Sequence, residues 1–339
     1  MLSYRPLVVS LLCFLGLFQI SYGQDLHFSQ YNYAPLLTNP ASTGDMDNEW
    51  RFTHNYRSQW YSVSTPFSTY SLSFEKNFIR NSKQYGIGMN LLYDQSGIVQ
   101  LQIAKINVSG SYQFNFYRQS LRFGLQAGWN LYQYSLDGLT TDNQWDQNIG
   151  YFNPALSSGE LNDGESMNYL TINTGFLYRY QSIGGLDHRI GISLFNVNQP
   201  ANGFDNKEKT PLSLSGQYSV AVPLSSKTRI IPNLIYRFQA KAEYLVLGVN
   251  YFRLTNPNDY QVTALHTGLK FRTGFNRNSD AIIVHGGLSF LRTEVGISYD
   301  VNVSKLTVAS GYQGAFELYL VYQAFFKQAY PGAVPCSRQ

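Results

Sequence analysis

The chain contains almost no cysteine, and no long apolar run follows its first 24 residues. Its two cysteines are Cys13, within an apolar N-terminal stretch, and Cys336, close to the C-terminus. If the N-terminal stretch is removed, Cys336 has no partner, which excludes an intrachain disulfide. A membrane-spanning helix needs about 18 or more consecutive apolar residues. The sequence after residue 24 therefore predicts neither a disulfide-stapled domain nor a helical membrane protein.

Charge and catalytic motifs are also scarce. Asp, Glu, Lys and Arg make up 14% of the chain, and the net charge of +4 is too small to predict nucleic-acid binding. The histidines lack the spacing of a metal site; they are His27, His54, His188, His266 and His285. Neither a nucleophile elbow nor a phosphate-binding P-loop is present. We therefore expect no enzymatic activity, no cofactor and no metal.

Two local patterns resemble ligand sites only weakly. Asp142-Asn-Gln-Trp-Asp-Gln-Asn148 offers oxygen ligands for calcium but lacks the glycine and the distal glutamate of an EF-hand, so a solvated loop is the favoured interpretation. Gly86 and Gly88 lie inside an alternating segment. There we expect glycine to relieve crowding or mark a bend rather than to hold phosphate.

The sequence is instead dominated by alternation, from about residue 50 to residue 326. In Val295-Gly-Ile-Ser-Tyr-Asp-Val-Asn-Val303, odd positions are apolar or aromatic and even positions are small or polar. Successive side chains of a strand point to opposite faces, so such a segment has one apolar face and one polar face. The pattern is too extensive for a small sandwich. It predicts an all-β fold, a transmembrane antiparallel β-barrel with lipid outside and water inside.

We count about 14 strands, within a range of about 12 to 16. The clearest strands cover residues 106–116, 121–131, 170–180, 212–220, 245–251 and 295–303. Tight turns are expected at 117–120, 182–187 and 224–227, and long connections at 136–167 and 197–210. If both termini of the chain are periplasmic, strand parity places the three turns on the periplasmic side and both long connections at the cell surface.

The whole chain divides into four parts. Residues 1–23 have the features of a signal peptide: Arg5, an apolar stretch, and small residues at Ser21 and Gly23 before the expected cleavage. Residues 24–49 form a leader without alternation, 50–326 the barrel, and 327–339 a periplasmic tail. We expect the mature protein in the outer membrane.

The leader contains turn signals of its own. Asn39 can cap a short helix that begins at Pro40, because proline is favoured at a first helical position. A segment with internal turns next to the first strand is well placed to fold back into the lumen as a plug. An ordered periplasmic collar is the alternative.

Charged residues inside the predicted strands are expected to face the lumen, because a charge facing lipid at mid-depth costs about 2–4 kcal/mol. These residues are Lys105, Arg122, Arg179, Arg237, Lys270 and Asp300. They either line a conduit or cross-link a closed lumen. The 27 tyrosines and 22 phenylalanines are typical of the aromatic girdles of a barrel.

The end of the first strand offers a candidate partner site. Arg57, Gln59 and Trp60 precede the first outward connection. Arginine and tryptophan are enriched among interface anchors, which favours a rim site that contacts a secreted partner. In the alternative interpretation, Trp60 belongs to the aromatic girdle.

The leader and the first hairpin also carry a family resemblance. The segments QDLHFSQY at 24–31, APL at 34–36, NPA at 39–41 and NYR at 55–57 resemble the start of the PorP/SprF family. Members of that family are outer-membrane proteins tied to the type IX secretion system of Bacteroidota. SYDVN at 298–302, FEL at 316–318 and the cysteine-containing tail resemble the C-terminal end of the family.

This resemblance implies a function and a set of partners. It implies a non-enzymatic barrel in outer-membrane lipid that works with the type IX secretion machinery and helps export or anchor a cognate cell-surface adhesin, including adhesins of gliding motility. It implies no catalytic residue, no cofactor and no nucleic acid. The alternative is a passive outer-membrane channel or a hydrophobic-solute transporter.

Overall fold

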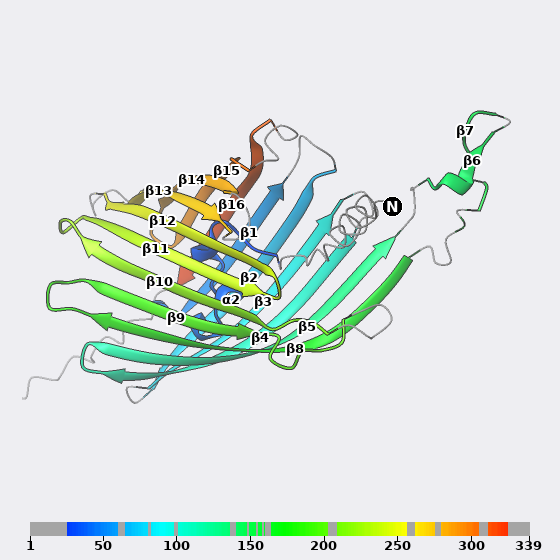
Figure 1. Ribbon diagram of the computed structural model, residues 1–339. Coiled ribbons are helices and arrows are strands. Elements are labelled where there is room, and N and C mark those ends of the chain that lie inside the picture. The colour runs from blue at the N-terminus through cyan, green and yellow to red at the C-terminus, as the bar shows by residue number, and fades with distance from the viewer. Residues whose placement is uncertain are drawn as a thin grey trace, which may run out of the picture.

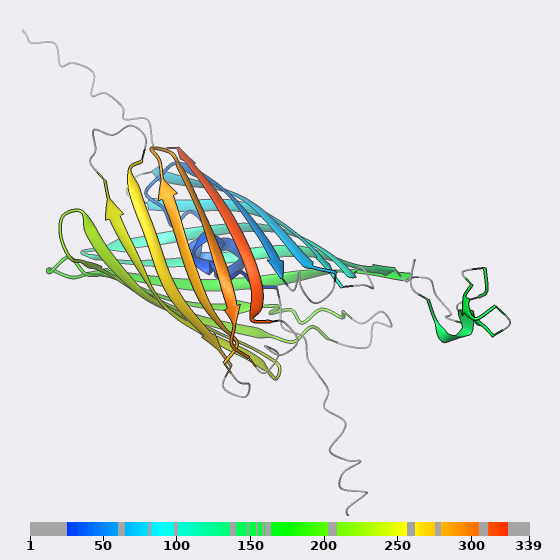
Figure 2. The same cartoon turned by 90° about the horizontal axis from the view of Figure 1, so that it is seen from above.

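The computed structural model describes residues 26–59, 65–80, 83–97, 101–135, 140–147, 149–153, 155–157, 159, 164–202, 209–255, 262–274, 279–304 and 311–324. Within these residues, 14 antiparallel strands form one closed barrel (Figures 1 and 2). Each strand pairs with its neighbours in sequence, and β1 closes the ring by pairing with β16. The expected all-β barrel and its strand number are confirmed.

The barrel strands are β1 Trp50–Gln59, β2 Phe67–Arg80, β3 Lys83–Ser96, β4 Leu101–Phe116, β5 Gln119–Ser135, β8 Gly164–Gln181, β9 Asp187–Phe195, β10 Ser213–Pro223, β11 Thr228–Gln239, β12 Ala242–Leu254, β13 Ala264–Thr273, β14 Ala281–Ser289, β15 Thr293–Asn302 and β16 Gln313–Ala324. The leader forms three single turns, η1 Tyr31–Tyr33, α2 Pro35–Thr38 and η2 Pro40–Ser42. Between β5 and β8, η3 Asp142–Gln144 precedes a two-stranded hairpin of β6 Trp145–Asp146 and β7 Tyr151–Phe152.

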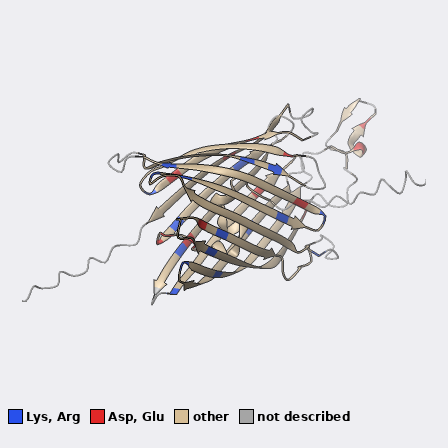
Figure 3. Ribbon diagram, turned by 60° about the vertical axis from the view of Figure 1, so that its left-hand side comes forward, with Lys and Arg blue, Asp and Glu red and all other residues tan. Residues whose placement is uncertain are grey.

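Burial along the strands is inverted relative to a soluble protein. In β5, Phe123 and Leu125 are 50% and 65% exposed, whereas Arg122 and Gln126 are 1% and 4% exposed. The apolar side chains point outward because lipid covers the wall, and the small and polar ones fill the lumen. Most of the barrel ribbon is neither acidic nor basic (Figure 3).

The connections follow the expected parity. The turns after β4, β8 and β10 lie at one end of the barrel, and the connections after β5 and β9 lie at the other. The turn after β4 is tighter than expected, since only Tyr117 and Arg118 separate the strands and Arg118 adopts a φ of 58°. The expectation that residues 164–167 belong to the long connection is wrong. β8 starts at Gly164, because its first residues pair with the end of β5.

The leader lies inside the ring of strands, where its blue ribbon is visible in Figures 1 and 2. Leu36, Asn39 and Ala41 are each 1% exposed or less. The β6–β7 hairpin lies away from the barrel, beyond the ends of β5 and β8 (Figure 1). Among the described residues, no helix is long and apolar enough to cross a membrane. The predicted signal peptide, Trp60 and the tail at 327–339 lie outside the described residues.

Candidate functional site

The leader is the feature that distinguishes this barrel from an empty one, and its local sequence explains its path. Pro35 and Pro40 each occupy the first position of a turn, where a missing N–H costs nothing. Asn39 caps the second turn by accepting a hydrogen bond from the Ala41 N–H at 2.8 Å, as the sequence predicts. Its amide also donates to the Phe176 carbonyl of β8 at 3.1 Å, so the cap also ties the leader to the wall.

Strand glycines provide the space in which the leader lies. A Cβ at Gly124 of β5 would lie 2.3 Å from the carbonyl carbon and oxygen of Pro40. At Gly86 of β3 it would lie 2.2 Å from the Thr43 carbonyl oxygen, and at Gly175 of β8 2.0 Å from Asn39 Oδ1. A non-glycine residue at these positions would displace the leader. Gly86 thus relieves crowding, one of the two roles expected for it.

The leader's first turn is held by two buried carboxylates. The N–H groups of Ser29 and Gln30 donate to Glu317 of β16 at 2.7 and 2.9 Å. The Ser29 hydroxyl donates to Asp300 of β15 at 2.6 Å. Glu317 and Asp300 are 2% and 1% exposed, so these charges are compensated inside the protein rather than by bulk water.

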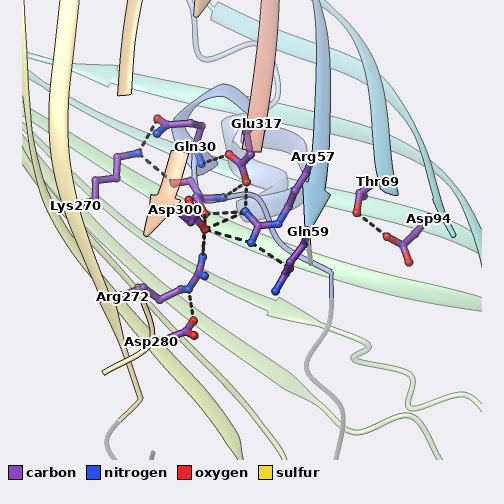
Figure 4. A network of polar contacts seen from close by, with 11 residues as sticks. Gln30, Arg57, Gln59, Thr69, Asp94, Lys270, Arg272, Asp280, Asp300 and Glu317 are labelled. Carbon is purple, nitrogen blue, oxygen red and sulfur yellow. Dashed lines mark hydrogen bonds and ion pairs between the residues drawn. The ribbon is translucent and has the colours of Figure 1, made fainter. Parts of the chain in front are cut away.

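Three cations surround the two carboxylates (Figure 4). Arg57 of β1 donates to Asp300 and to Glu317. Arg272 of β13 has Nη1 3.0 Å from Asp300 Oδ2. Lys270, also in β13, donates to the Ser29 carbonyl at 3.2 Å and to the Gln30 side-chain oxygen at 3.0 Å. We call Arg57, Lys270, Arg272, Asp300 and Glu317 the ion cluster. It joins four strands of the wall, β1, β13, β15 and β16, to Ser29 and Gln30 of the leader.

The end of the leader is fixed by a second set of charges. Arg122 of β5 donates to the Thr43 carbonyl at 3.0 Å, and Arg189 of β9 donates to Asp45 at 3.2 Å. Burial raises the pKa of Asp45, but Arg189 and Arg122 more than offset this and hold it below its ordinary value of 3.8. Asp45 is therefore an anion at neutral pH and anchors the leader electrostatically.

All six charges predicted to face the lumen do point inward from their strands. Arg122, Lys270 and Asp300 are each 1% exposed. Arg179 pairs with Asp187 at 2.8 Å, Arg237 donates to the Ser213 hydroxyl at 3.0 Å, and Lys105 lines a small luminal cavity. Three of the six, Arg122, Lys270 and Asp300, bond the leader directly.

The predicted rim site requires a correction at Arg57. Its side chain is not at the rim, because residue 57 follows the inward parity of Thr53 and Asn55 and ends in the ion cluster, 5% exposed. Gln59 ends β1 and accepts a hydrogen bond from Arg57 at 3.2 Å, so it extends the same network. Trp60 lies outside the described residues.

Several residues of the site were not identified from the sequence. Ser29, Gln30, Arg272 and Glu317 belong to it, yet they are spread over 289 positions of the chain. Arg272 and Glu317 did carry a usable signal, since each is a charge at an inward-facing position of an alternating segment. Ser29 and Gln30 lack such a signal, because only the barrel closure brings the leader to β15 and β16.

Two luminal cavities flank the leader. The larger, about 380 Å³, lies toward the end of the barrel with the short turns and is lined by Tyr33, Asp45, Asp187, Arg229 and Glu294, among others. We call it the vestibule. The smaller, about 40 Å³, lies toward the opposite end and is lined by Leu26, Lys105 and Asn196. Leader residues thus line both cavities, Tyr33 and Asp45 the vestibule and Leu26 the smaller one.

The described residues contain no group of three or more His, Cys, Asp or Glu side chains able to hold a metal ion. His266 bonds the Tyr319 hydroxyl through Nε2 at 2.9 Å, and Tyr319 stacks on Tyr33 of the leader with ring centroids 3.7 Å apart. Here a luminal histidine supports the position of the leader.

Solved structures with a similar fold are outer-membrane barrels. The Ralstonia pickettii toluene transporter TbuX matches with a TM-score of 0.52 at 12% identity, over 87% of this chain and 94% of that one. The monoaromatic hydrocarbon channel CymD gives 0.53 at 12%, over 86% and 93%. A Pseudomonas aeruginosa FadL homologue gives 0.51 at 8%, over 84% and 92%. At these identities the likeness establishes the fold alone. This barrel fold, together with the family match described next, supports an outer-membrane location.

The sequence itself matches one protein family and no curated protein. The family match covers residues 20–322, which includes the whole leader and nearly all of the barrel. The luminal leader and the closed 14-stranded wall are therefore features of a family member, and the chain belongs to the type IX secretion system membrane proteins of the PorP/SprF family.

Proposed function

We propose that this protein is a plugged, non-enzymatic outer-membrane barrel that helps the type IX secretion system export or anchor one cognate adhesin at the cell surface. The observation that carries the proposal is the leader fixed in the lumen by the ion cluster. Breaking a buried ion pair by removing one partner costs about 3–5 kcal/mol. A plug held by several such contacts suits a barrel that retains a partner better than one that conducts freely.

The β6–β7 hairpin supplies a surface for the adhesin. Trp145, Tyr151 and Phe152 are 44%, 55% and 40% exposed, and Trp145 packs edge-to-face on Phe152 with centroids 5.0 Å apart. Tryptophan and tyrosine are the side chains most enriched at binding hot spots. The hairpin belongs to the end that carries the long connections, the end assigned to the cell surface by strand parity.

Deletion of the gene tests the proposal. We expect surface display of one adhesin to be lost while other type IX substrates are secreted normally, and re-expression of the intact chain to restore display. Unchanged amounts of every surface adhesin in the deletion strain would contradict the proposal.

A second candidate function is passage of small apolar solutes. An apolar groove on the lipid-facing side of β11 to β14 favours it, as does the similarity to barrels named as a toluene transporter and a monoaromatic hydrocarbon channel. Reconstituted protein separates the two functions. A barrel silent in planar bilayers that does not accelerate toluene entry into vesicles supports anchoring, whereas accelerated entry supports transport.

A further inference from the structure

Pro232 occupies an unusual position, inside β11, which is paired on both sides in a closed sheet. Proline has no N–H and is normally confined to strand starts, sheet edges and bulges. The pairing of β10 with β11 stops after Ser219↔Asn233 and resumes at Val222↔Ile230. We call the four residues of this interruption the seam: Val220, Ala221, Ile231 and Pro232. The same residues pair normally with β9 and β12, so the break is confined to one line in the wall.

An apolar groove lies on the outer face beside the seam. Its volume is about 590 Å³, and Pro232, Leu247, Val249, Leu269 and Phe271 line it. The last four side chains are 37% to 57% exposed and belong to the lipid-facing set. The groove is therefore continuous with the surface that membrane acyl chains cover.

The inner face of the same wall carries an apolar cluster. Elsewhere the inward positions are mainly small, polar or charged, but Ile235, Tyr244, Val246 and Ile283 form a buried apolar cluster around Tyr31 of the leader. At the seam itself, the inward positions of both strands, Ala221 and Ile231, line the vestibule. The end of an apolar chain that entered at the seam would therefore contact Ala221 and Ile231, whereas the charged residues of the vestibule, such as Asp45 and Glu294, disfavour deeper insertion.

The outer groove and the vestibule are separated by only one layer of wall. Tyr218, Asn233 and Leu234 line both spaces. β10 and β11 lack their mutual pairing just beside these residues, so the wall has fewer backbone hydrogen bonds here than where the ladder is continuous.

The leader connects to this point through Tyr31. Its hydroxyl donates to Asn233 Oδ1 at 2.5 Å, and the Asn233 amide donates to the Ile231 carbonyl at 2.8 Å. The Tyr31 ring in turn lies under Lys270, with Nζ 4.6 Å from the ring centroid. Tyr31 thus contacts both Lys270 of the ion cluster and Asn233, which in turn bonds Ile231 of the seam.

We propose that the seam is a lateral binding site for the acyl chain of a membrane lipid. The chain lies in the outer groove, its end inserts between β10 and β11 toward the vestibule, and the Tyr31–Asn233 contact limits the insertion. This goes beyond the proposed role in adhesin display and does not depend on it.

Quenching by spin-labelled lipid tests the proposal. In a Cys336→Ser background, Ser219→Cys carries a bimane fluorophore on the vestibule side of the seam. The full-length mature protein is reconstituted in phosphatidylcholine vesicles that contain 12-doxyl phosphatidylcholine. Pro232→Val restores a backbone N–H through which β11 should pair with β10, whereas Tyr31→Phe removes only the hydroxyl that donates to Asn233. The matched controls are Pro223→Val, at the end of β10, and Tyr33→Phe, which removes a hydroxyl from the same turn η1 but keeps the Tyr31 hydroxyl that donates to Asn233.

We expect doxyl quenching to fall at least twofold in Pro232→Val and to rise at least twofold in Tyr31→Phe, with both controls equal to the parent. Iodide, which reaches the label only through water, should quench all five proteins alike.

Equal doxyl quenching in parent, Pro232→Val and Tyr31→Phe would overturn the proposal. If Pro232→Val does not give a heat-modifiable barrel, Pro232→Ala restores the same N–H. Free toluene is also added as a competitor. If it relieves the doxyl quenching as strongly as added unlabelled phosphatidylcholine does, the groove is a site for small apolar solutes, and the proposal is overturned.

Discussion

Arg57 and Asp300 are 243 positions apart in the chain and meet inside the barrel, with Nη1 3.2 Å from Oδ2. Arg57 belongs to β1 and Asp300 to β15, so the pair crosses β16, where Glu317 accepts from the same guanidinium. The strands at which the barrel closes are therefore linked by charge as well as by backbone pairing, and the leader is held at that closure.

Arg57→Ala should destabilise the barrel. The change leaves Asp300 and Glu317 buried with less compensation, at a cost of about 3–5 kcal/mol. The folded, heat-modifiable fraction should fall, and adhesin display should fall only in proportion. Arg118→Ala, in an exposed turn, is the control and should leave both unchanged. If Arg57→Ala instead gives a normal amount of folded barrel but selectively loses adhesin display, Arg57 binds the partner rather than stabilising the barrel.

Gly124→Ala should displace the leader. The new Cβ would lie 2.3 Å from the Pro40 backbone, and overpacking of this kind costs about 1–3 kcal/mol. Hydrogen exchange of residues 36–43 should accelerate while the strands stay protected. Gly216→Ala is the matched control, because a Cβ there meets nothing within 4 Å. Unaltered exchange in Gly124→Ala would mean that the leader is not packed on this strand.

Acidification should loosen the end of the leader. Because the folded pKa of Asp45 lies below its ordinary value, its stabilising contribution is complete above that ordinary value and is lost as pH falls through the folded pKa. Hydrogen exchange or proteolysis near residue 45 should therefore increase as the pH falls below about 4, and should not change between about pH 8 and pH 5. These windows follow from an ordinary carboxyl pKa of about 4. Asp45→Asn should abolish this step and be looser already at pH 7.

Trp145→Ser with Tyr151→Ser should reduce adhesin display at normal barrel abundance. Both side chains are exposed on the β6–β7 hairpin, so their loss removes contact area without disturbing the wall, and hot-spot residues typically contribute 2 kcal/mol or more, on the order of a 30-fold change in affinity. Ile183→Ser is the control, an 89% exposed apolar residue in a turn at the opposite end. Equal display in both variants would exclude the hairpin as the contact.

Orientation can be read from epitope accessibility. An epitope inserted near Ser158, in the connection between β5 and β8, should be labelled on intact cells. One inserted at Arg118, in the turn after β4, should be labelled only after permeabilisation, because the two connections lie at opposite ends of the barrel. The reverse pattern would invert the protein in the membrane and place the vestibule at the cell surface.

The sequence alone determined the wall. Alternation is a local property, since each strand residue points to the face opposite its neighbours, and it identified β5 and β15, the strand number and the inward direction of charges such as Arg122 and Asp300. The cap formed by Asn39 and the turn at Pro40 were equally predictable, because capping involves residues two positions apart.

Only the tertiary structure decided what the inward residues do. The parity that turns Arg57 inward is visible in the sequence, but its partners Asp300 and Glu317 lie more than 240 positions away, and their meeting depends on the closure of β1 on β16. The same holds for Gly124, whose missing side chain matters because Pro40 lies against it, and for Pro232, which is anomalous only once both neighbours of β11 are known. Local periodicity fixes the face a residue shows, whereas ring closure and the returning leader fix what that face contacts.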